Sequence, residues 1–181
     1  MGLPCLIFMP ANMSEERRQM MRTYGAKIID APDNDFSGAI SMRDQYLKAN
    51  PNAWSPMQFS NQDNVQCHRV QTAPEIHKQV IEENQIWSAF IHGAGTGGTM
   101  EGIRRYKELH NLRTKLCLVQ PAESPHGIQG IADGKDFLFN SENADNIILM
   151  HQGTIEEKGS HKDLLEQKGR YYALYRQQEA S

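Results

Sequence analysis

The stretch Phe90–Ile103, FIHGAGTGGTMEGI, decides the fold that this sequence predicts. It begins as an apolar run, passes through five glycines and two threonines within ten residues, and continues with a helix-like pattern. Glycines placed just before a helix let backbone N–H groups approach an anion, and the helix N-terminus adds positive potential. The stretch therefore predicts a strand, a phosphate-binding turn and a helix, in that order.

The segments on either side of this turn alternate between short apolar runs and helix-like runs. The predicted strands are PCLIFM (4–9), AKIIDAP (26–32), IWSAFIHG (86–93) and TKLCLVQP (114–121). Helices are predicted at 14–25, 36–51, 73–84 and 99–110, and WSPMQF (54–59) is either a weak strand or a loop. Alternation of this kind is typical of βαβ units. We therefore expect an α/β fold, with a parallel sheet covered by helices on both faces.

The pattern changes after Phe137, where a polar segment precedes a different arrangement. IILMHQGTIEEKG (147–159) predicts two short strands joined by a hairpin turn at Gln152 and Gly153. SHKDLLEQ (160–167) and RYYALYRQQ (170–178) predict two short helices. We place a domain boundary between Phe139 and Ala144, so that residues 1–139 form one region and residues 140–181 a C-terminal tail.

Composition excludes several classes of protein. A length of 181 residues is enough for a domain with a real core. The net charge of −3 gives no sign of a nucleic-acid surface, and no apolar run approaches the roughly 20 residues that a membrane helix needs. Cys5, Cys67 and Cys117 lack metal-ligand spacing and indicate buried, reduced thiols in a cytoplasmic protein.

The glycine turn has more than one interpretation from its residues alone. Its glycines fit the pattern G-x-G-x-x-G of dinucleotide-binding folds, but the acidic residue that this fold needs would be Glu123, which lies late. Thr96 and Thr99 add hydroxyl donors, which suit a compact terminal phosphate better than a bridging pyrophosphate. The remaining alternative is a glycine-rich turn without a ligand, although five glycines cost backbone entropy with no packing return.

GTGGT (95–99) resembles the phosphate loop of the cysteine synthase family, which are fold-type-II pyridoxal-phosphate enzymes. Other segments resemble motifs of this family in the right order, over about three quarters of the chain: MPANMSEERRQMMRTYGAKII (9–29), QFSNQDN (58–64), TAPEI (72–76) and VQPAESPHGIQGIADG (119–134). The resemblance implies pyridoxal phosphate as the cofactor. It also implies the formation of cysteine from an activated serine and sulfide, or a related β-replacement.

The same resemblance implies roles for particular residues. Those that would hold the cofactor phosphate are Gly95, Thr96, Gly97, Gly98 and Thr99. Gln58 would reach toward the substrate carboxylate, and Gly130 and Ile131 would lie near the cofactor face. Two of the residues have ordinary alternatives: Gln58 as a polar residue at a strand end, and His126 as a loop histidine and not a base.

The family's Schiff-base lysine and its Ser/Thr-Gly-Asn loop lie in segments that have no counterpart among these motifs. The family reaction needs that lysine to hold the cofactor and to transfer a proton. Five lysines have an ordinary solvated interpretation: Lys27, Lys48, Lys78, Lys107 and Lys115. We therefore expect no catalytic residue and no metal site in this chain. We expect at most a weak, non-covalent scaffold for phosphate or pyridoxal phosphate, with a possible homo-oligomer. The alternative is a non-catalytic structural or interaction protein whose glycine loop is vestigial.

The last segment resembles a second family. ADNIILMHQGTIEEKGSHKDLLEQKGRYYALYRQQ (144–178) is similar to the C-terminal end of an ABC-exporter ATPase domain. Because the sequence contains no G-x-x-x-x-G-K-[ST] motif, we do not expect this tail to hydrolyse ATP. We interpret the tail as a packing appendage and the chain as a fusion of two fragments, natural or designed.

Overall fold

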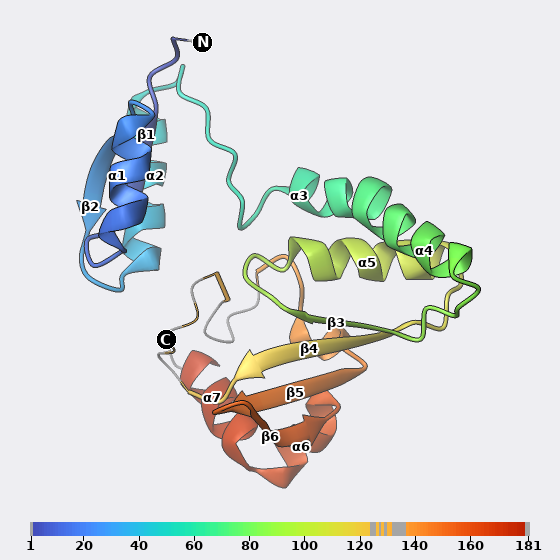
Figure 1. Ribbon diagram of the computed structural model, residues 1–181. Helices are drawn as coiled ribbons and strands as arrows, with labels where there is room; N and C mark the ends of the chain where they lie inside the picture. The colour runs from blue at the N-terminus through green and yellow to red at the C-terminus, as the bar shows by residue number, and fades with distance from the viewer. Residues whose placement is uncertain (1, 124–125, 127, 129, 132–136, 180–181) are drawn as a thin grey trace. The chain divides into compact units, whose positions relative to one another are not determined.

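The computed structural model describes residues 2–123, 126, 128, 130–131 and 137–179 (Figure 1). The chain forms two compact units, Met1–Pro56 and Met57–Ser181, and each unit has its own sheet. Both units combine parallel strands with helices, so the predicted α/β class is confirmed. The expectation of one sheet is corrected, because the strands pair in two sheets, one of two strands and one of four. The segment 50–61, which spans the boundary between the units in sequence, contains two prolines and no strand.

The first unit alternates strand and helix. Its elements are β1 (Leu6–Pro10), α1 (Glu15–Thr23), β2 (Lys27–Ala31) and α2 (Phe36–Ala49). The two strands pair in parallel, with Leu6 opposite Lys27. Gly25 follows α1 with a φ of +84°, a left-handed conformation that glycine adopts without strain after a helix. The four elements predicted from this part of the sequence are therefore confirmed.

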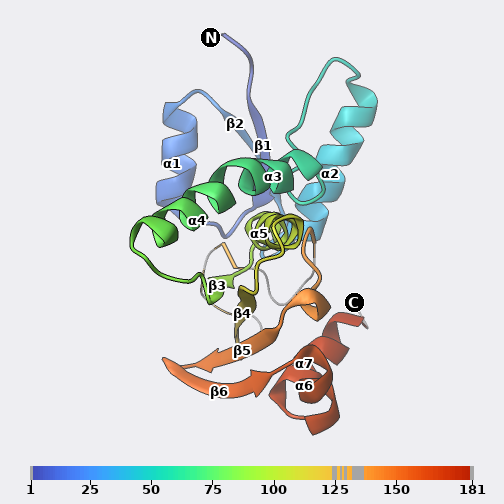
Figure 2. The same cartoon turned by 90° about the vertical axis from the view of Figure 1, so that its right-hand side faces the viewer.

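The second unit begins with helices and continues into a four-stranded sheet (Figures 1 and 2). Its elements are α3 (Gln62–Cys67), the π-helical turn η1 (His68–Thr72), α4 (Ala73–Glu82), β3 (Ala89–Gly93), α5 (Gly98–Leu109), β4 (Lys115–Pro121), the short turn η2 (Ser141–Asn143), β5 (Asn146–His151), β6 (Thr154–Gly159), α6 (His161–Gln167) and α7 (Arg170–Glu179). The strand order is β3-β4-β5-β6; the first three strands are parallel and β6 is antiparallel to β5.

The C-terminal hairpin extends the sheet that carries the glycine turn. β5 pairs in parallel with β4, with Cys117 opposite Asn146 and Pro121 opposite Met150. The carboxylate of Asp145 strengthens this junction, because it accepts the N–H of Leu116 at 2.8 Å. The predicted boundary between 139 and 140 concerns the origin of the two segments and stays a prediction; the sheet of the second unit runs across it.

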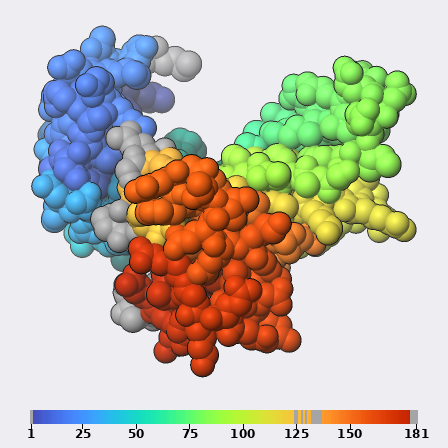
Figure 3. Space-filling view, turned by 60° about the horizontal axis from the view of Figure 1, so that its bottom comes forward, coloured from blue at the N-terminus to red at the C-terminus, as the bar shows by residue number. Residues whose placement is uncertain are grey.

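One hydrophobic core joins the glycine-turn segment to the tail. Met100, Ile103 and Tyr106 recur every three residues on one side of α5, and all three are buried. They belong to the same cluster of buried side chains as Leu149 on β5 and Leu164 on α6. The space-filling view shows β5, β6, α6 and α7 as one continuous mass in orange and red (Figure 3). Burial of apolar surface therefore holds both segments in one unit.

Of the two alternatives predicted for WSPMQF (54–59), the structure has the loop: no strand forms there, and Met57 has a φ of +46°, which strand geometry does not allow. Other local predictions need correction. Helices α3 and η1 were not predicted, because only Val65 provides a buried apolar side chain there. Cys5 and Cys67 are exposed, and only Cys117 is buried as predicted. Cys5 lies one residue before β1, and Cys67 is the last residue of α3.

Candidate functional site

The glycine turn connects the carboxyl end of β3 to the N-terminus of α5. Gly97 is the N-cap of α5 and has a φ of +82°, in the left-handed region that favours glycine. The carbonyl of Gly97 accepts the N–H of Glu101 at 3.0 Å, which is the first hydrogen bond of the helix. The first N–H groups of α5 therefore have no partner inside the helix and point to the turn. This arrangement is suited to an anion.

The glycines of the turn lie so close to neighbouring groups that a Cβ atom at their positions would clash with those groups. A Cβ at Gly97 would lie 2.6 Å from the backbone nitrogen of Phe139. A Cβ at Gly95 would collide with the carbonyl oxygen of Gly130, and one at Gly98 with the side chain of Asn64. The glycines thus have a packing role, which corrects the expectation that they bring no packing return. Their number alone does not require a ligand.

Both hydroxyl groups of the turn have partners on the segment α3–η1. The hydroxyl oxygen of Thr96 accepts the N–H of Gly98 at 3.3 Å and the side-chain N–H of Asn64 at 3.0 Å. The hydroxyl of Thr99 lies 3.2 Å from Nε2 of His68. Asn64 and His68 are four residues apart, so they lie on one side of a helical segment. Neither residue was predicted from the sequence as part of the site, although Asn64 ends the motif QFSNQDN.

Gln58 is connected to the turn through Asn64. Its backbone carbonyl accepts the side-chain N–H of Asn64 at 2.9 Å, and the same nitrogen reaches Thr96. The side chain of Gln58 is exposed. The structure thus brings Gln58 and the glycine turn together, as a substrate site beside a phosphate site would require.

The segment after β4 contacts the turn from another side. The N–H of Leu138 donates to the carbonyl of Thr96 at 3.0 Å. A Cβ at Gly93 would lie 2.7 Å from Cδ1 of Ile131, so Ile131 and its neighbour Gly130 both lie against the turn. Residues 124–125, 127, 129 and 132–134 of the quoted family motif lie outside the described residues.

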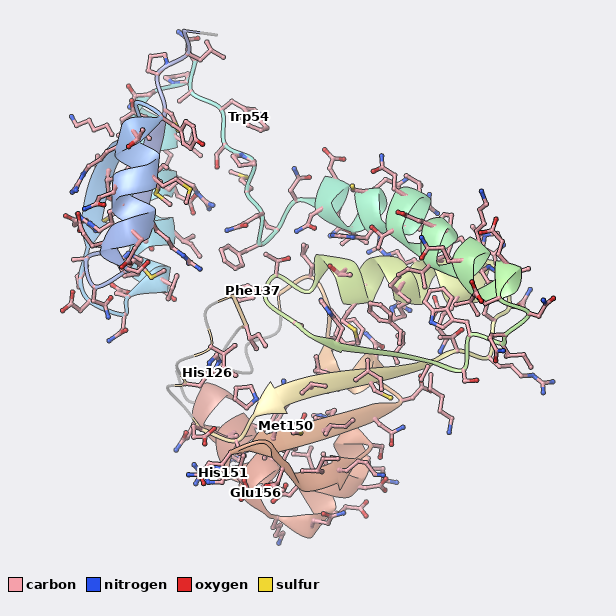
Figure 4. The ribbon with its side chains drawn as sticks, in the orientation of Figure 1. Trp54, His126, Phe137, Met150, His151 and Glu156 are labelled. Atoms are coloured by element: carbon pink, nitrogen blue, oxygen red, sulfur yellow. The ribbon has the colours of Figure 1, made fainter. Side chains whose placement is uncertain are left out.

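His126, which Figure 4 labels together with Phe137, is held locally. Its Nδ1 accepts the N–H of Ile128 at 3.1 Å, which matches the interpretation as a loop histidine. Phe137 packs against Phe59, with ring centroids 4.6 Å apart. This aromatic pair joins the segment after β4 to the residue that follows Gln58. The two segments that contact the glycine turn, one with Gln58 and one with Leu138, are thus also in contact with each other.

Charges near the N-terminus of α5 are balanced. Burial alone would raise the pKa of Glu101, but hydrogen bonds from Arg104 and Arg105 outweigh burial and lower it. The guanidinium Nε atoms of these arginines lie 2.6 and 2.7 Å from the Glu101 carboxylate. Arg105 also donates to Oε1 of Gln62 at 2.9 Å, at the start of α3. Because two arginines neutralise Glu101, its charge does not exclude an anion from the turn.

His92, at the end of β3, has a lowered pKa. Its half-burial is the main cause, and the charge of His68 adds to it. Among the residues that the structure describes, no group of three or more His, Cys, Asp or Glu side chains has the arrangement of a metal site. In the described part of the chain, no helix has the length and apolar character needed to cross a membrane.

These observations define the structural class of the protein: it is an α/β protein in which a glycine-rich turn joins a parallel strand to a helix. A family model described as pyridoxal-phosphate dependent enzyme matches residues 1–174. The chain belongs to this family of pyridoxal-phosphate-dependent enzymes. The match extends across the predicted boundary at 139–140 and into α7.

Curated relatives and solved structures agree with this assignment. The chain is 29% identical over 168 residues to a cysteine synthase of Staphylococcus aureus, with 86% of this chain and 53% of the relative covered. It is 36% identical over 126 residues to a probable cysteine synthase of Bacillus subtilis, with 68% and 40% covered. A crystal structure of cysteine synthase from Entamoeba histolytica has a TM-score of 0.68 at 32% identity, covering 82% of this chain and 46% of that one.

A hydrogen sulfide-producing enzyme from Fusobacterium nucleatum is also similar, with a TM-score of 0.66 at 36% identity. That match covers 75% of this chain and 43% of the enzyme. The chain thus spans about half the length of the curated relatives it matches. The fold-type-II assignment made from the sequence is confirmed, and the roles of individual residues stay predictions.

Proposed function

We propose that residues 95–99 bind the phosphate group of pyridoxal phosphate without a covalent bond. The observation that carries this proposal is the left-handed turn at Gly97, which places the N-terminus of α5 beside the hydroxyls of Thr96 and Thr99. The first N–H groups of a helix have no acceptor within the helix. A phosphate accepts hydrogen bonds and carries negative charge, so backbone N–H groups, hydroxyls and a helix N-terminus suit it. Membership of a pyridoxal-phosphate-dependent family supports this choice of ligand.

In this proposal the chain binds and orients, and none of its described residues is assigned a catalytic step. Pyridoxal phosphate, when bound, supplies an electron sink for chemistry at an amino-acid substrate. The turn fixes the phosphate end of the cofactor, and Gln58 binds the substrate carboxylate nearby. We propose β-replacement on an activated serine as the reaction of the whole protein, because the relatives named above are cysteine synthases. Its cytoplasmic location would keep the unpaired cysteines reduced.

The second candidate is a structural protein whose turn binds nothing, with a tail derived from an ABC ATPase. The packing of the glycines favours this candidate, because it explains them without a ligand. In this view the hairpin β5–β6 completes the sheet and carries no nucleotide chemistry. The two candidates differ in one measurable property, which is whether phosphate binds at the turn.

The test is a titration of the intact chain with inorganic phosphate, followed by amide NMR shifts. We expect shifts centred on residues 95–99, with a Kd on the order of millimolar, equivalent to ~4 kcal/mol. Gly97→Asp should abolish binding, because it places a carboxylate at the anion and a Cβ against Phe139. Absorbance of pyridoxal phosphate should report the same loss.

Gly153→Asp is the matched control. Gly153 has a φ of +79° and open space around it, in the hairpin turn between β5 and β6. It carries the same strain and the same added charge away from the glycine turn, so phosphate binding should persist. A Thr96→Val and Thr99→Val double variant tests the loop without a steric clash and should weaken binding. Shifts outside residues 95–99, or shifts that survive in both loop variants, contradict the proposed function.

A further inference from the structure

Asn64 is the third residue of α3 and lies between two segments of the candidate site. Its amide nitrogen donates to the backbone carbonyl of Gln58 at 2.9 Å and to the hydroxyl oxygen of Thr96 at 3.0 Å. The carbonyl of Gln58 can only accept, so the NH₂ end of the amide must face it. The two hydrogens of one nitrogen therefore serve two different acceptors.

The hydroxyl of Thr96 is left with a single hydrogen-bonding capacity. A hydroxyl group has two lone pairs and one proton. The N–H groups of Asn64 and Gly98 both donate to this oxygen, at 3.0 and 3.3 Å, and together they use both lone pairs. Only the hydroxyl proton remains available. The hydroxyl of Thr96 can therefore take part in one further hydrogen bond, and in that bond it must be the donor.

Gly98 makes this contact possible. A Cβ at position 98 would collide with the amide of Asn64, so glycine lets the amide lie directly against the turn. Helix α3 is held in place independently, because Arg105 of α5 donates to Gln62 at 2.9 Å. The amide of Asn64 therefore approaches Thr96 from a segment that has its own connection to α5.

We infer that Asn64 is a positioning residue that makes the hydroxyl of Thr96 a dedicated donor to a tetrahedral oxyanion in the glycine turn. This inference rests on the proposed function and deepens it. A phosphate monoester has only acceptor oxygens toward the protein when it is fully ionised, so a hydroxyl that can only donate suits it. A ligand that must donate at this position, such as an amine or an amide, is disfavoured.

A double-mutant cycle separates this role from general support of the fold. The variants are Asn64→Ala, Thr96→Val and the double variant, each titrated with inorganic phosphate and followed by amide NMR. Loss of one hydrogen bond to a charged ligand corresponds to roughly a tenfold change in Kd. We expect each single variant to weaken binding about five- to tenfold. The double variant should bind no more than about twofold more weakly than Thr96→Val.

A second readout does not depend on the ligand. Three-bond couplings report the χ1 rotamer of Thr96, which should be single in the native chain and averaged in Asn64→Ala. Asn61→Ala is the matched control, because Asn61 caps the same helix by accepting the N–H of Asp63 at 2.9 Å. That variant should loosen the start of α3 and leave the Thr96 rotamer single.

The outcomes distinguish the two claims. An unchanged Thr96 rotamer in Asn64→Ala overturns the positioning role, as do single-variant effects that multiply in the double variant. Absence of phosphate shifts in the native chain contradicts the proposed function, and with it the ligand assigned to Thr96. Averaging of Thr96 together with a non-multiplicative cycle supports the inference.

Discussion

At the scale of single residues, the turn depends on the absence of a Cβ atom at three of its glycines. Gly95, Gly97 and Gly98 each leave space that a neighbouring group occupies, and Gly97 also requires a left-handed backbone. These tight contacts bring polar groups from distant segments onto the hydroxyls of Thr96 and Thr99. A residue-level test of the site must therefore separate packing from recognition, which is why isosteric threonine variants accompany Gly97→Asp.

His92 gives a residue-level prediction about pH. Its pKa lies below the ordinary value of 6.5, because burial and the charge of His68 both disfavour the protonated ring. In the unfolded chain the ring takes up its proton near 6.5, whereas the folded chain resists protonation. The contribution of His92 to the free energy of unfolding should therefore be fully present above pH 6.5 and should be lost as the pH is lowered toward the pKa of the folded state.

The measurement is an NMR titration of the histidine ring protons, with denaturant unfolding at several pH values. His68→Gln removes the neighbouring charge, so the pKa of His92 should rise part of the way toward its ordinary value. His110→Gln, at the far end of α5, is the matched control and should leave His92 unchanged. A His92 ring that titrates at or above 6.5 would refute this account.

At the scale of elements, the sequence predicted what local patterns control. The βαβ order, the hairpin turn at Gln152 and Gly153 and the helix from Gly98 all follow from apolar runs and glycines that are close in sequence. Helix α3 and the π-helical turn η1 were missed, because contacts with α5 hold them and their own apolar pattern is weak. Gly102 illustrates this: a Cβ there would lie 2.5 Å from Cβ of His68.

The candidate site shows the same division. The glycine turn was predicted because its residues are contiguous. The partners of its hydroxyls could not be, since Asn64 is 32 positions from Thr96 and His68 is 31 positions from Thr99. No local pattern specifies such pairs; they follow from the packing of α3 and η1 against α5. The division of the strands into two sheets was missed for the same reason, because it depends on pairing between distant segments.

The shared core gives a prediction for the element β5. Leu149 is fully buried in the cluster that also contains Trp87 and Ile103. Leu149→Ala should lower the free energy of unfolding by about 2–5 kcal/mol, because it leaves a cavity in this core. Ile155→Ala on the paired strand β6 is the matched control, since Ile155 is 57% exposed. Its effect should stay within about 0.5 kcal/mol.

Denaturant unfolding followed by far-UV circular dichroism and by tryptophan fluorescence measures this effect. In a Trp54→Phe background the fluorescence reports Trp87, which precedes the predicted boundary in sequence. The Trp87 transition should shift to lower denaturant in Leu149→Ala, because Trp87 and Leu149 belong to one hydrophobic core. The far-UV signal also contains the helices of the first unit, so only the part that reports the second unit should shift with it. A Trp87 transition that stays at its original midpoint would show that the tail unfolds independently.

At the scale of the whole molecule, the family assignment covers almost the entire chain, whereas the chain covers only part of the length of its relatives. The family is defined by its pyridoxal-phosphate chemistry, and the match extends over residues 1–174. The chain spans about half the length of its curated relatives, and the parts it shares with them include the glycine turn and its supporting segment. The proposed phosphate recognition needs only the second unit, because every residue assigned to it above lies between Met57 and Ser181.

The lysines provide the last prediction, which concerns the chain as a whole. Among the lysines that the structure describes, Lys107 pairs with Asp145 at 3.3 Å, and the others are exposed: Lys27, Lys48, Lys78, Lys115, Lys158, Lys162 and Lys168. Their amines are therefore solvated or already neutralised, and burial does not activate any of them as a nucleophile. Incubation of the 181-residue chain with pyridoxal phosphate and borohydride should label several lysines at low level. Peptide mapping by mass spectrometry measures the distribution, and the Gly97→Asp variant should leave it unchanged. One stoichiometrically labelled lysine, lost in Gly97→Asp and retained in Gly153→Asp, would show instead that the glycine turn directs the cofactor to a catalytic amine within this chain.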